Sequence, residues 1–189
     1  MKYTVIYSDP PWSYKDKATA GRRGVNFKYP TLSIGDIKNL PIEKIAADNS
    51  ILFLWVTWPL LQEGLDTIKS WGFKYKTCGF VWIKKNKRSG TNFMGMGNYT
   101  RSNSELCLIG IRGKTTTLIK SHSVHQIIES PIELHSKKPD IVRDKIVELC
   151  GDVNRIELFS RQRIKGWDCI GNDIDGKDIR EVFNTFPEN

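Results

Sequence analysis

Asp9-Pro10-Pro11-Trp12 follows the first apolar run of the chain, which ends at Tyr7. The two prolines donate no N–H and hold φ at roughly −65°, so the chain leaves its strand here. A carboxylate, two unpaired proline carbonyls and a flat indole then form one acceptor-only cradle. A planar amine, such as the exocyclic amine of adenine, could give its hydrogens to Asp9 and the Pro10 carbonyl while Trp12 stacks on the ring. A simple Asp-Pro turn with a core tryptophan is the alternative.

The chemistry that suits this cradle is methyl transfer to the amine. Accepting both hydrogens localises the nitrogen lone pair, which can then attack a methyl donor on the opposite side. Positive charge develops on the nitrogen, and the Asp9 carboxylate would stabilise it in the transition state. The candidate catalytic residues are therefore Asp9, Pro10, Pro11 and Trp12.

Further blocks follow in order along the chain. They are Tyr29-Pro30-Thr31-Leu32-Ser33, His135-Ser136-Lys137-Lys138-Pro139-Asp140, Glu157-Leu158-Phe159-Ser160-Arg161, Gly166-Trp167-Asp168 and Gly171-Asn172-Asp173. With Asp-Pro-Pro-Trp, they resemble the adenine methyltransferases that include the eukaryotic messenger-RNA adenosine methylases. The resemblance implies an α/β, Rossmann-like methyltransferase fold with S-adenosylmethionine as cofactor. It also implies a mostly parallel sheet with one antiparallel hairpin strand, and a permuted order in which Asp9 precedes the cofactor strand.

The resemblance also implies a cofactor pocket lined by Asp9, Lys138, Arg161, Asn172 and Asp173. The residue types suit this assignment. Lys138 stands at a helix start and could hold a carboxylate. Phe159 could pack on the adenosine, Arg161 and Arg163 could reach its polar edges, and Asn172 could bind hydroxyls. A solvated lysine, solvated arginines and a turn asparagine are the alternatives.

Bulk composition favours a nucleic-acid partner. The chain has 189 residues, which predicts one domain over 1–189. Lys and Arg number 29 against 21 Asp and Glu, a formal charge of +8, which suits a polyanion. No stretch approaches the ~20 apolar residues of a membrane span, and no signal peptide is evident. We therefore expect a cytoplasmic protein of a bacterium or phage, with no membrane partner.

Cysteine and histidine spacing gives no sign of a metal site. Cys78, Cys107, Cys150 and Cys169 form no Cys-x-x-Cys pair and are typical of reduced core residues. His122 and His125 lie three apart, but no cysteine or carboxylate cluster follows at zinc spacing. We expect no metal.

Apolar periodicity predicts alternating strands and helices. The continuous run 51–56 indicates a central strand buried on both faces, and the helix after Thr57, which we expect to cap it, ends at Gly72. Together they indicate a layered α/β fold. Residues 112–136 are polar and are expected to be irregular. Further strands are expected at 73–83, 105–111 (antiparallel to the one before), 154–159 and 167–170, with helices at 34–40, 139–150 and 177–183.

Two basic loops could bind the substrate. The loop 13–30 directly after the catalytic strand suits a lid, and the resemblance places Tyr29 near the target base. The loop 84–101 suits a second lid on a phosphate backbone. Solvated surface is the alternative for each. The candidate substrate-binding residues are Trp12, Tyr14, Tyr29, Lys84, Lys85, Lys87, Arg101, Glu105 and His122.

The function predicted from the sequence is S-adenosylmethionine-dependent methylation of the adenine amine in DNA. A short, basic, unfused chain without an RNA-binding module favours DNA, and RNA stays open as the alternative substrate. A second hypothesis is a non-catalytic nucleic-acid-binding subunit that scaffolds an active partner. A degenerate subunit would be free to lose Asp9, Lys138 or Asn172, and all three are present. A homodimer or a partner subunit also stays open.

Overall fold

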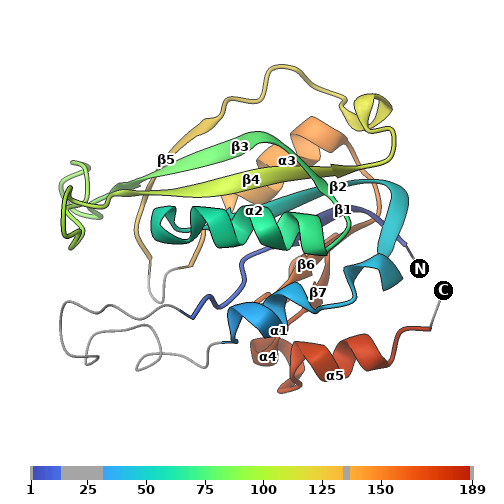
Figure 1. The fold of residues 1–189 in the computed structure, drawn as a ribbon. Helices are drawn as coiled ribbons and strands as arrows, with labels where there is room; N and C mark the ends of the chain where they lie inside the picture. Colours follow the sequence, from blue (N-terminus) through green and yellow to red (C-terminus); the bar gives the residue numbers. More distant parts are fainter. Residues whose placement is uncertain (1, 14–31, 134–136, 188–189) are drawn as a thin grey trace.

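The computed structural model describes residues 2–13, 32–133 and 137–187 (Figure 1). These residues form a seven-stranded sheet in which only β4 (Ser104–Arg112) runs antiparallel to both of its neighbours. The predicted α/β, Rossmann-like class with its one antiparallel strand is confirmed. In spatial order the strands are β5 (Ile127–Pro131), β3 (Lys74–Lys85), β4 (Ser104–Arg112), β2 (Ala46–Val56), β1 (Tyr3–Ser8), β6 (Arg155–Leu158) and β7 (Asp168–Ile170).

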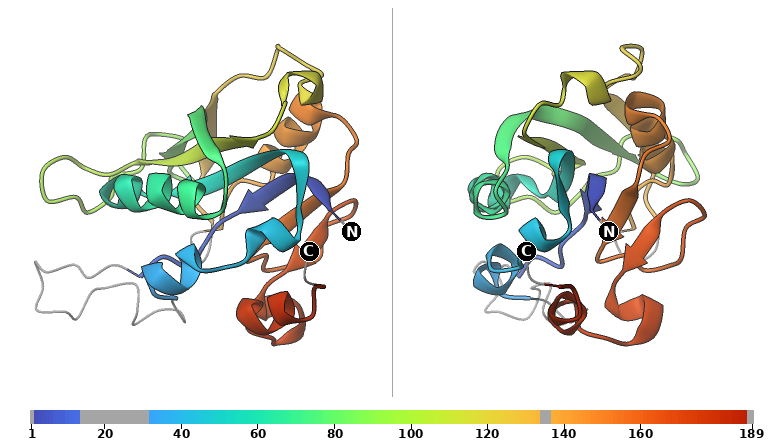
Figure 2. Two further views of the ribbon diagram at one scale, coloured as in Figure 1. Left: turned by 45° about the vertical axis from the view of Figure 1, so that its right-hand side comes forward. Right: turned by 90° about the vertical axis from the view of Figure 1, so that its right-hand side faces the viewer.

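Helices cover both faces of the sheet (Figures 1 and 2). One apolar core lies under α1 (Ile34–Lys38), α2 (Leu61–Ser70) and α5 (Ile179–Asn184), and the other lies under α3 (Ile141–Cys150). The short α4 (Asn172–Asp175) follows β7 directly. Single 3₁₀ turns occur at η3 (Ile42–Lys44), η4 (Trp58–Leu60) and η5 (Thr116–Leu118).

The central strand β2 shows how the sequence builds this arrangement. Its run from Ile51 to Val56 is fully buried, as predicted. Successive side chains point to opposite faces, so Leu52 and Leu54 join the core under α2 while Phe53 and Trp55 join the core under α3. Because this strand is buried on both faces, polar residues at alternate positions would lie in one of the two cores, and its sequence is therefore continuously apolar.

Two local predictions were wrong. The segment 112–136 contains the edge strand β5, which pairs in parallel with β3. The signal was weak because only Ile128 of this strand is buried. Thr57 makes no side-chain capping hydrogen bond and precedes the 3₁₀ turn η4 instead of an α-helix.

The sheet has a switch point between β1 and β6. From β1 the chain passes through α1 on one face to β2, whereas β6 is reached from α3 on the other face. The connections therefore diverge at the carboxyl ends of these two strands, the place where open α/β sheets bind ligands. No helix in the described part of the chain is long and apolar enough to cross a bilayer.

Candidate active site

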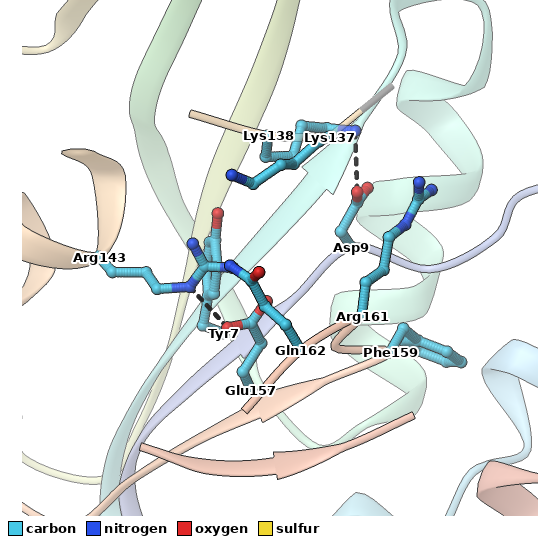
Figure 3. Close-up of a pocket in the computed structure, with 9 residues that line it drawn as sticks. All are labelled: Tyr7, Asp9, Lys137, Lys138, Arg143, Glu157, Phe159, Arg161 and Gln162. Carbon is cyan, nitrogen blue, oxygen red and sulfur yellow. Dashed lines mark hydrogen bonds and ion pairs between the residues drawn. The ribbon is translucent and has the colours of Figure 1, made fainter. Parts of the chain in front are cut away.

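A pocket opens at this switch point, between the ends of β1 and β6 and the residues that lead into α3 (Figure 3). Four residues predicted for the site, Asp9, Lys138, Phe159 and Arg161, line it together. Five more were not predicted to belong to the site. They are Tyr7, Lys137, Arg143, Glu157 and Gln162.

A network of ion pairs with alternating charges orders the side chains on the Asp9 side of the pocket. Lys138 Nζ lies 2.9 Å from Asp9 Oδ2 and 3.2 Å from Glu105 Oε2, and Lys84 Nζ lies 2.5 Å from Glu105 Oε1. The Lys138 ammonium is also 5.7 Å from the ring centre of Trp55, within cation–π range. Lys138 and Glu105 are only 10% and 9% exposed at their side chains, so water screens these contacts little.

Burial and neighbouring charges set the protonation states of the residues in this network. Burial pushes the pKa of Lys138 down, but Asp9 and Glu105 outweigh it and raise the pKa, so the ammonium persists. Burial pushes the pKa of Glu105 up, but Lys138 and Lys84 prevail and lower it. At Asp9 burial prevails over Lys138 and raises the pKa. Asp9 is therefore a stronger proton acceptor than an exposed aspartate.

A buried ion pair forms the opposite wall. Arg143 donates from Nε and Nη2 to the two Glu157 oxygens at 2.6 and 2.7 Å, and from Nη1 to Asp140 at 2.6 Å. Its guanidinium lies 5.7 Å from the ring centre of Tyr7, whose hydroxyl accepts a hydrogen bond from Trp55 Nε1 at 2.7 Å. The sequence signal was a glutamate between the apolar Ile156 and Leu158, which needs a cation when buried.

Phe159, in the pocket wall, has a strained backbone conformation. Its φ of 61° lies in the left-handed region, which bulky residues rarely adopt. The next residue, Ser160, donates its N–H to the Ile170 carbonyl at 2.9 Å. A Cβ at Gly171 would collide with the Ser160 carbonyl, so glycine is required for this close approach. Strain of this kind is concentrated at functional sites.

Comparison with known proteins identifies the chain's family. The MT-A70 family profile matches residues 3–173. The type II methyltransferase M.MunI of a Mycoplasma species is 36% identical over 189 aligned residues, which cover 92% of this chain and 78% of that protein. This chain belongs to the MT-A70 family. It is a methyltransferase, as the resemblance predicted.

Longer MT-A70 relatives match the same region. The human N(6)-adenosine-methyltransferase catalytic subunit METTL3 is 27% identical over 178 residues, which are 93% of this chain and 29% of that protein. The MT-A70-like protein of Drosophila melanogaster is 28% identical over 178 residues and is covered to 27%. The chain thus spans under a third of the length of these two relatives but most of M.MunI.

The Asp-Pro-Pro-Trp segment of this MT-A70 chain differs from the predicted cradle in two ways. Trp12 does not present a stacking surface, because it is only 6% exposed and its Nε1 donates to the Trp55 carbonyl at 2.9 Å. The proline carbonyls are also not unpaired. Pro10 accepts from the Trp12 N–H at 2.8 Å and Pro11 from the Leu32 N–H at 3.2 Å, although each oxygen has a second lone pair.

His122 was wrongly grouped with the substrate residues. Because β4 runs antiparallel, it carries the chain to the opposite edge of the sheet, where residues 113–121 lie before the chain returns to β5. Lys120 donates its N–H to the carbonyl of Leu149, near the far end of α3. A residue exposed at that edge cannot meet a base held at Asp9.

The remaining predicted residues fall into four groups. Lys84 forms an ion pair with Glu105, and Lys85 forms one with Glu129. Glu105 is buried and also pairs with Lys138, so all three predicted residues have partners within the protein. Arg163, Asn172 and Asp173 are exposed near the pocket but do not line it, while Lys87 and Arg101 are exposed between β3 and β4. Tyr14, Tyr29 and the loop from residue 14 to 30 lie outside the described residues. Among the residues described, none form a cluster suited to a metal ion.

Lys138→Met is expected to shift the acid limb of the methylation profile to higher pH. We expect Asp9 to react as a carboxylate, so the rate should fall as pH drops through its pKa in the folded enzyme. Lys138 lowers that pKa, and its removal raises it further. The measurement is the rate between about pH 5 and pH 9 with saturating methyl donor.

Lys145→Met is the matched control, because Lys145 pairs with Glu148 on the exposed face of α3. Its acid limb should coincide with that of the wild type. An unchanged limb in Lys138→Met would mean that Lys138 does not act on Asp9.

Proposed function

We propose that the protein methylates the exocyclic amine of adenine in DNA, with S-adenosylmethionine as the methyl donor. The observation that carries the proposal is the placement of Asp9. Its carboxylate lies at the end of β1, in the pocket at the switch point, and is paired with Lys138. The MT-A70 family membership and the relatives named as N(6)-adenosine methyltransferases support the same reaction.

The residues of the pocket fit this cofactor. Lys138 would offer an ammonium for the carboxylate of the amino-acid end, and Asp9 would offer a negative charge that attracts the sulfonium. Phe159 offers an aromatic face to the adenosine, and Arg161 offers hydrogen-bond donors beside it. S-adenosylmethionine, when bound, supplies the electrophilic methyl group. Asn172 is proposed as a hydroxyl ligand from α4, beyond the pocket wall.

Asp9 would act on the adenine amine in two ways. Its Oδ oxygens accept an amine hydrogen, and the second lone pair of the Pro10 carbonyl accepts the other. As positive charge develops on the nitrogen, the carboxylate stabilises it without reorganising. The raised pKa of Asp9 also suits it to take up the proton that the methylated nitrogen releases.

Lys138 would position Asp9 in addition to holding the cofactor. It fixes the carboxylate at 2.9 Å, while its second counter-ion Glu105 keeps the ammonium charged. The resulting geometry is rigid because Glu105 is itself anchored by Lys84 from β3. We infer that this network of four charged side chains orients the Asp9 carboxylate towards the amine before the substrate binds.

DNA is proposed over RNA as the substrate. The match to M.MunI covers most of both proteins, and type II methyltransferases are the class that modifies DNA. The match to METTL3 covers 29% of that longer protein. The formal charge of +8 agrees with either polyanion.

Methylation of matched DNA and RNA oligonucleotides with labelled S-adenosylmethionine tests the proposal. We expect label in DNA. Label in RNA alone would favour the RNA adenosine methyltransferase reading. No label in either, together with no heat of S-adenosylmethionine binding in calorimetry, would favour a non-catalytic nucleic-acid-binding subunit. Association with a second subunit stays a prediction.

Lys87→Ala is expected to flatten the salt dependence of DNA binding more than Lys85→Ala. Lys87 is exposed, whereas Lys85 is held by Glu129 at 2.9 Å and by Asn92 at 2.9 Å. Loss of one phosphate contact lowers the slope of log K against log salt by about one unit. Fluorescence anisotropy titrations at several salt concentrations measure it. Equal slopes for Lys87→Ala and wild type would exclude Lys87 as a phosphate contact.

A further inference from the structure

The segment 86–103 joins β3 to β4 and extends away from the body of the sheet (Figures 1 and 2, light green). We call it the arm. It carries three large apolar side chains that are among the most exposed in the described structure. Met94 is 72% exposed, Met96 is 79% exposed and Tyr99 is fully exposed.

The arm is an ordered element. At its root, Phe93 donates its N–H to the Lys84 carbonyl and Lys84 to the Asn103 carbonyl, both at 2.8 Å. A Cβ at Gly95 would collide with the Ser102 carbonyl, and one at Gly97 with the Thr100 carbonyl. The returning backbone therefore lies against the glycines, and the alternating Met94 and Met96 stay on the outside.

The charge of the arm selects its partner. The segment contains Lys87, Arg88 and Arg101 and no acidic residue. A second copy of this chain would bring the same cations to the contact and carries a formal charge of +8. Apolar side chains with cations before and after them in the same loop instead suit a nucleic acid, whose phosphates meet the charges and whose base stack receives the apolar groups.

The root of the arm is connected to the catalytic carboxylate. Lys84, the last residue but one of β3, contacts Glu105, which contacts Lys138, which contacts Asp9. The arm therefore leaves the sheet at the edge where the target base must be presented. An adenine in a duplex can reach such a pocket only if it leaves the stack.

We propose that the arm enters duplex DNA and that Met94, Met96 and Tyr99 occupy the stack beside the extruded adenine. The proposal rests on the function proposed above and adds a device specific for duplex substrates. Met side chains are known wedges between base steps, and a tyrosine ring stacks on any base. The cations on either side would hold the flanking phosphates.

The test compares methylation of one DNA sequence as a duplex and as a single strand. The triple variant Met94→Ser, Met96→Ser, Tyr99→Ser should lose about tenfold or more on the duplex and stay within about twofold on the single strand. A duplex with an abasic site opposite the adenine should restore much of its rate, because no base pair has to be broken to extrude the adenine. Equal losses on both forms, or no loss, would overturn the proposal.

The matched control is Tyr75→Ser. Tyr75 is 44% exposed and lies near the start of β3, whereas the arm follows the end of that strand. Both rates should equal those of the wild type. A wild-type dimer that dissociates in the triple variant, seen by sedimentation, would assign the arm to self-association and overturn the proposal.

Failure of the proposed function would look different. Wild-type protein would then label neither form of DNA. The role of the arm could still be tested separately, by binding to a duplex in which 2-aminopurine replaces the target adenine. The fluorescence of this base rises when it unstacks. It should rise with wild type and not with the triple variant; an equal rise with both would overturn the proposal.

Discussion

Asp9→Asn is expected to lower the single-turnover methylation rate roughly a hundred- to thousandfold, which corresponds to about 3–4 kcal/mol of transition-state stabilisation. The amide keeps the shape but loses the negative charge and turns one acceptor into a donor. Asp9→Ala should cost at least as much. Because Lys138 keeps Glu105 as a counter-ion at 3.2 Å, neither change leaves a buried ammonium unpaired. The melting temperature should therefore fall by only a few degrees, at about 2–4 °C per kcal/mol.

Asp66→Asn is the control for this experiment. Asp66 also pairs with a lysine, Lys38 at 3.1 Å, but the pair joins α1 to α2 away from the pocket. It should leave the rate unchanged. Near wild-type methylation by Asp9→Ala would show that no acceptor is needed at this position. Unfolding of Asp9→Ala, with Asp66→Asn intact, would mean that Asp9 is a structural turn residue.

The central strand β2 could be predicted because its apolar run lies within one short segment of the sequence. A run such as Ile51 to Val56 is too short for a buried helix and is typical of a strand covered on both faces. The edge strand β5 has no such run and is defined by pairing with β3, more than 40 residues earlier in the sequence. Pairing partners at that separation leave no pattern in the segment itself.

The site was predictable where a motif fixes a residue beside a strand end. Asp9 and Phe159 follow β1 and β6 directly, so parallel pairing brings them to one edge. Trp12 shows the limit of this reasoning. Its place in the motif suggested a stacking surface, but the turn after Pro11 carries it into the core. Glu157, between two apolar residues, signals the need for a buried cation, but its partner Arg143 could not be found from the sequence, since the contact depends on how α3 lies over β6.

The buried Arg143–Glu157 pair gives the largest expected effect on stability. Arg143→Met should reduce the free energy of unfolding by about 3–5 kcal/mol, because it leaves Glu157 buried without its cation. Arg143 and Glu157 are 8% and 6% exposed, so water cannot take the place of the lost partner. Urea unfolding at neutral pH measures the change, and the melting temperature should fall by roughly 10 °C.

The double variant Arg143→Met, Glu157→Leu separates the ion pair from simple packing. Replacing a buried pair by apolar residues of similar volume is often close to neutral, so the double variant should be more stable than Arg143→Met alone. Lys145→Met breaks an exposed pair on the same helix and should cost less than about 1 kcal/mol. Additive losses in the double variant would show that Arg143 and Glu157 act independently. A stable double variant that methylates poorly would instead show that the pair serves the pocket, in which both side chains lie.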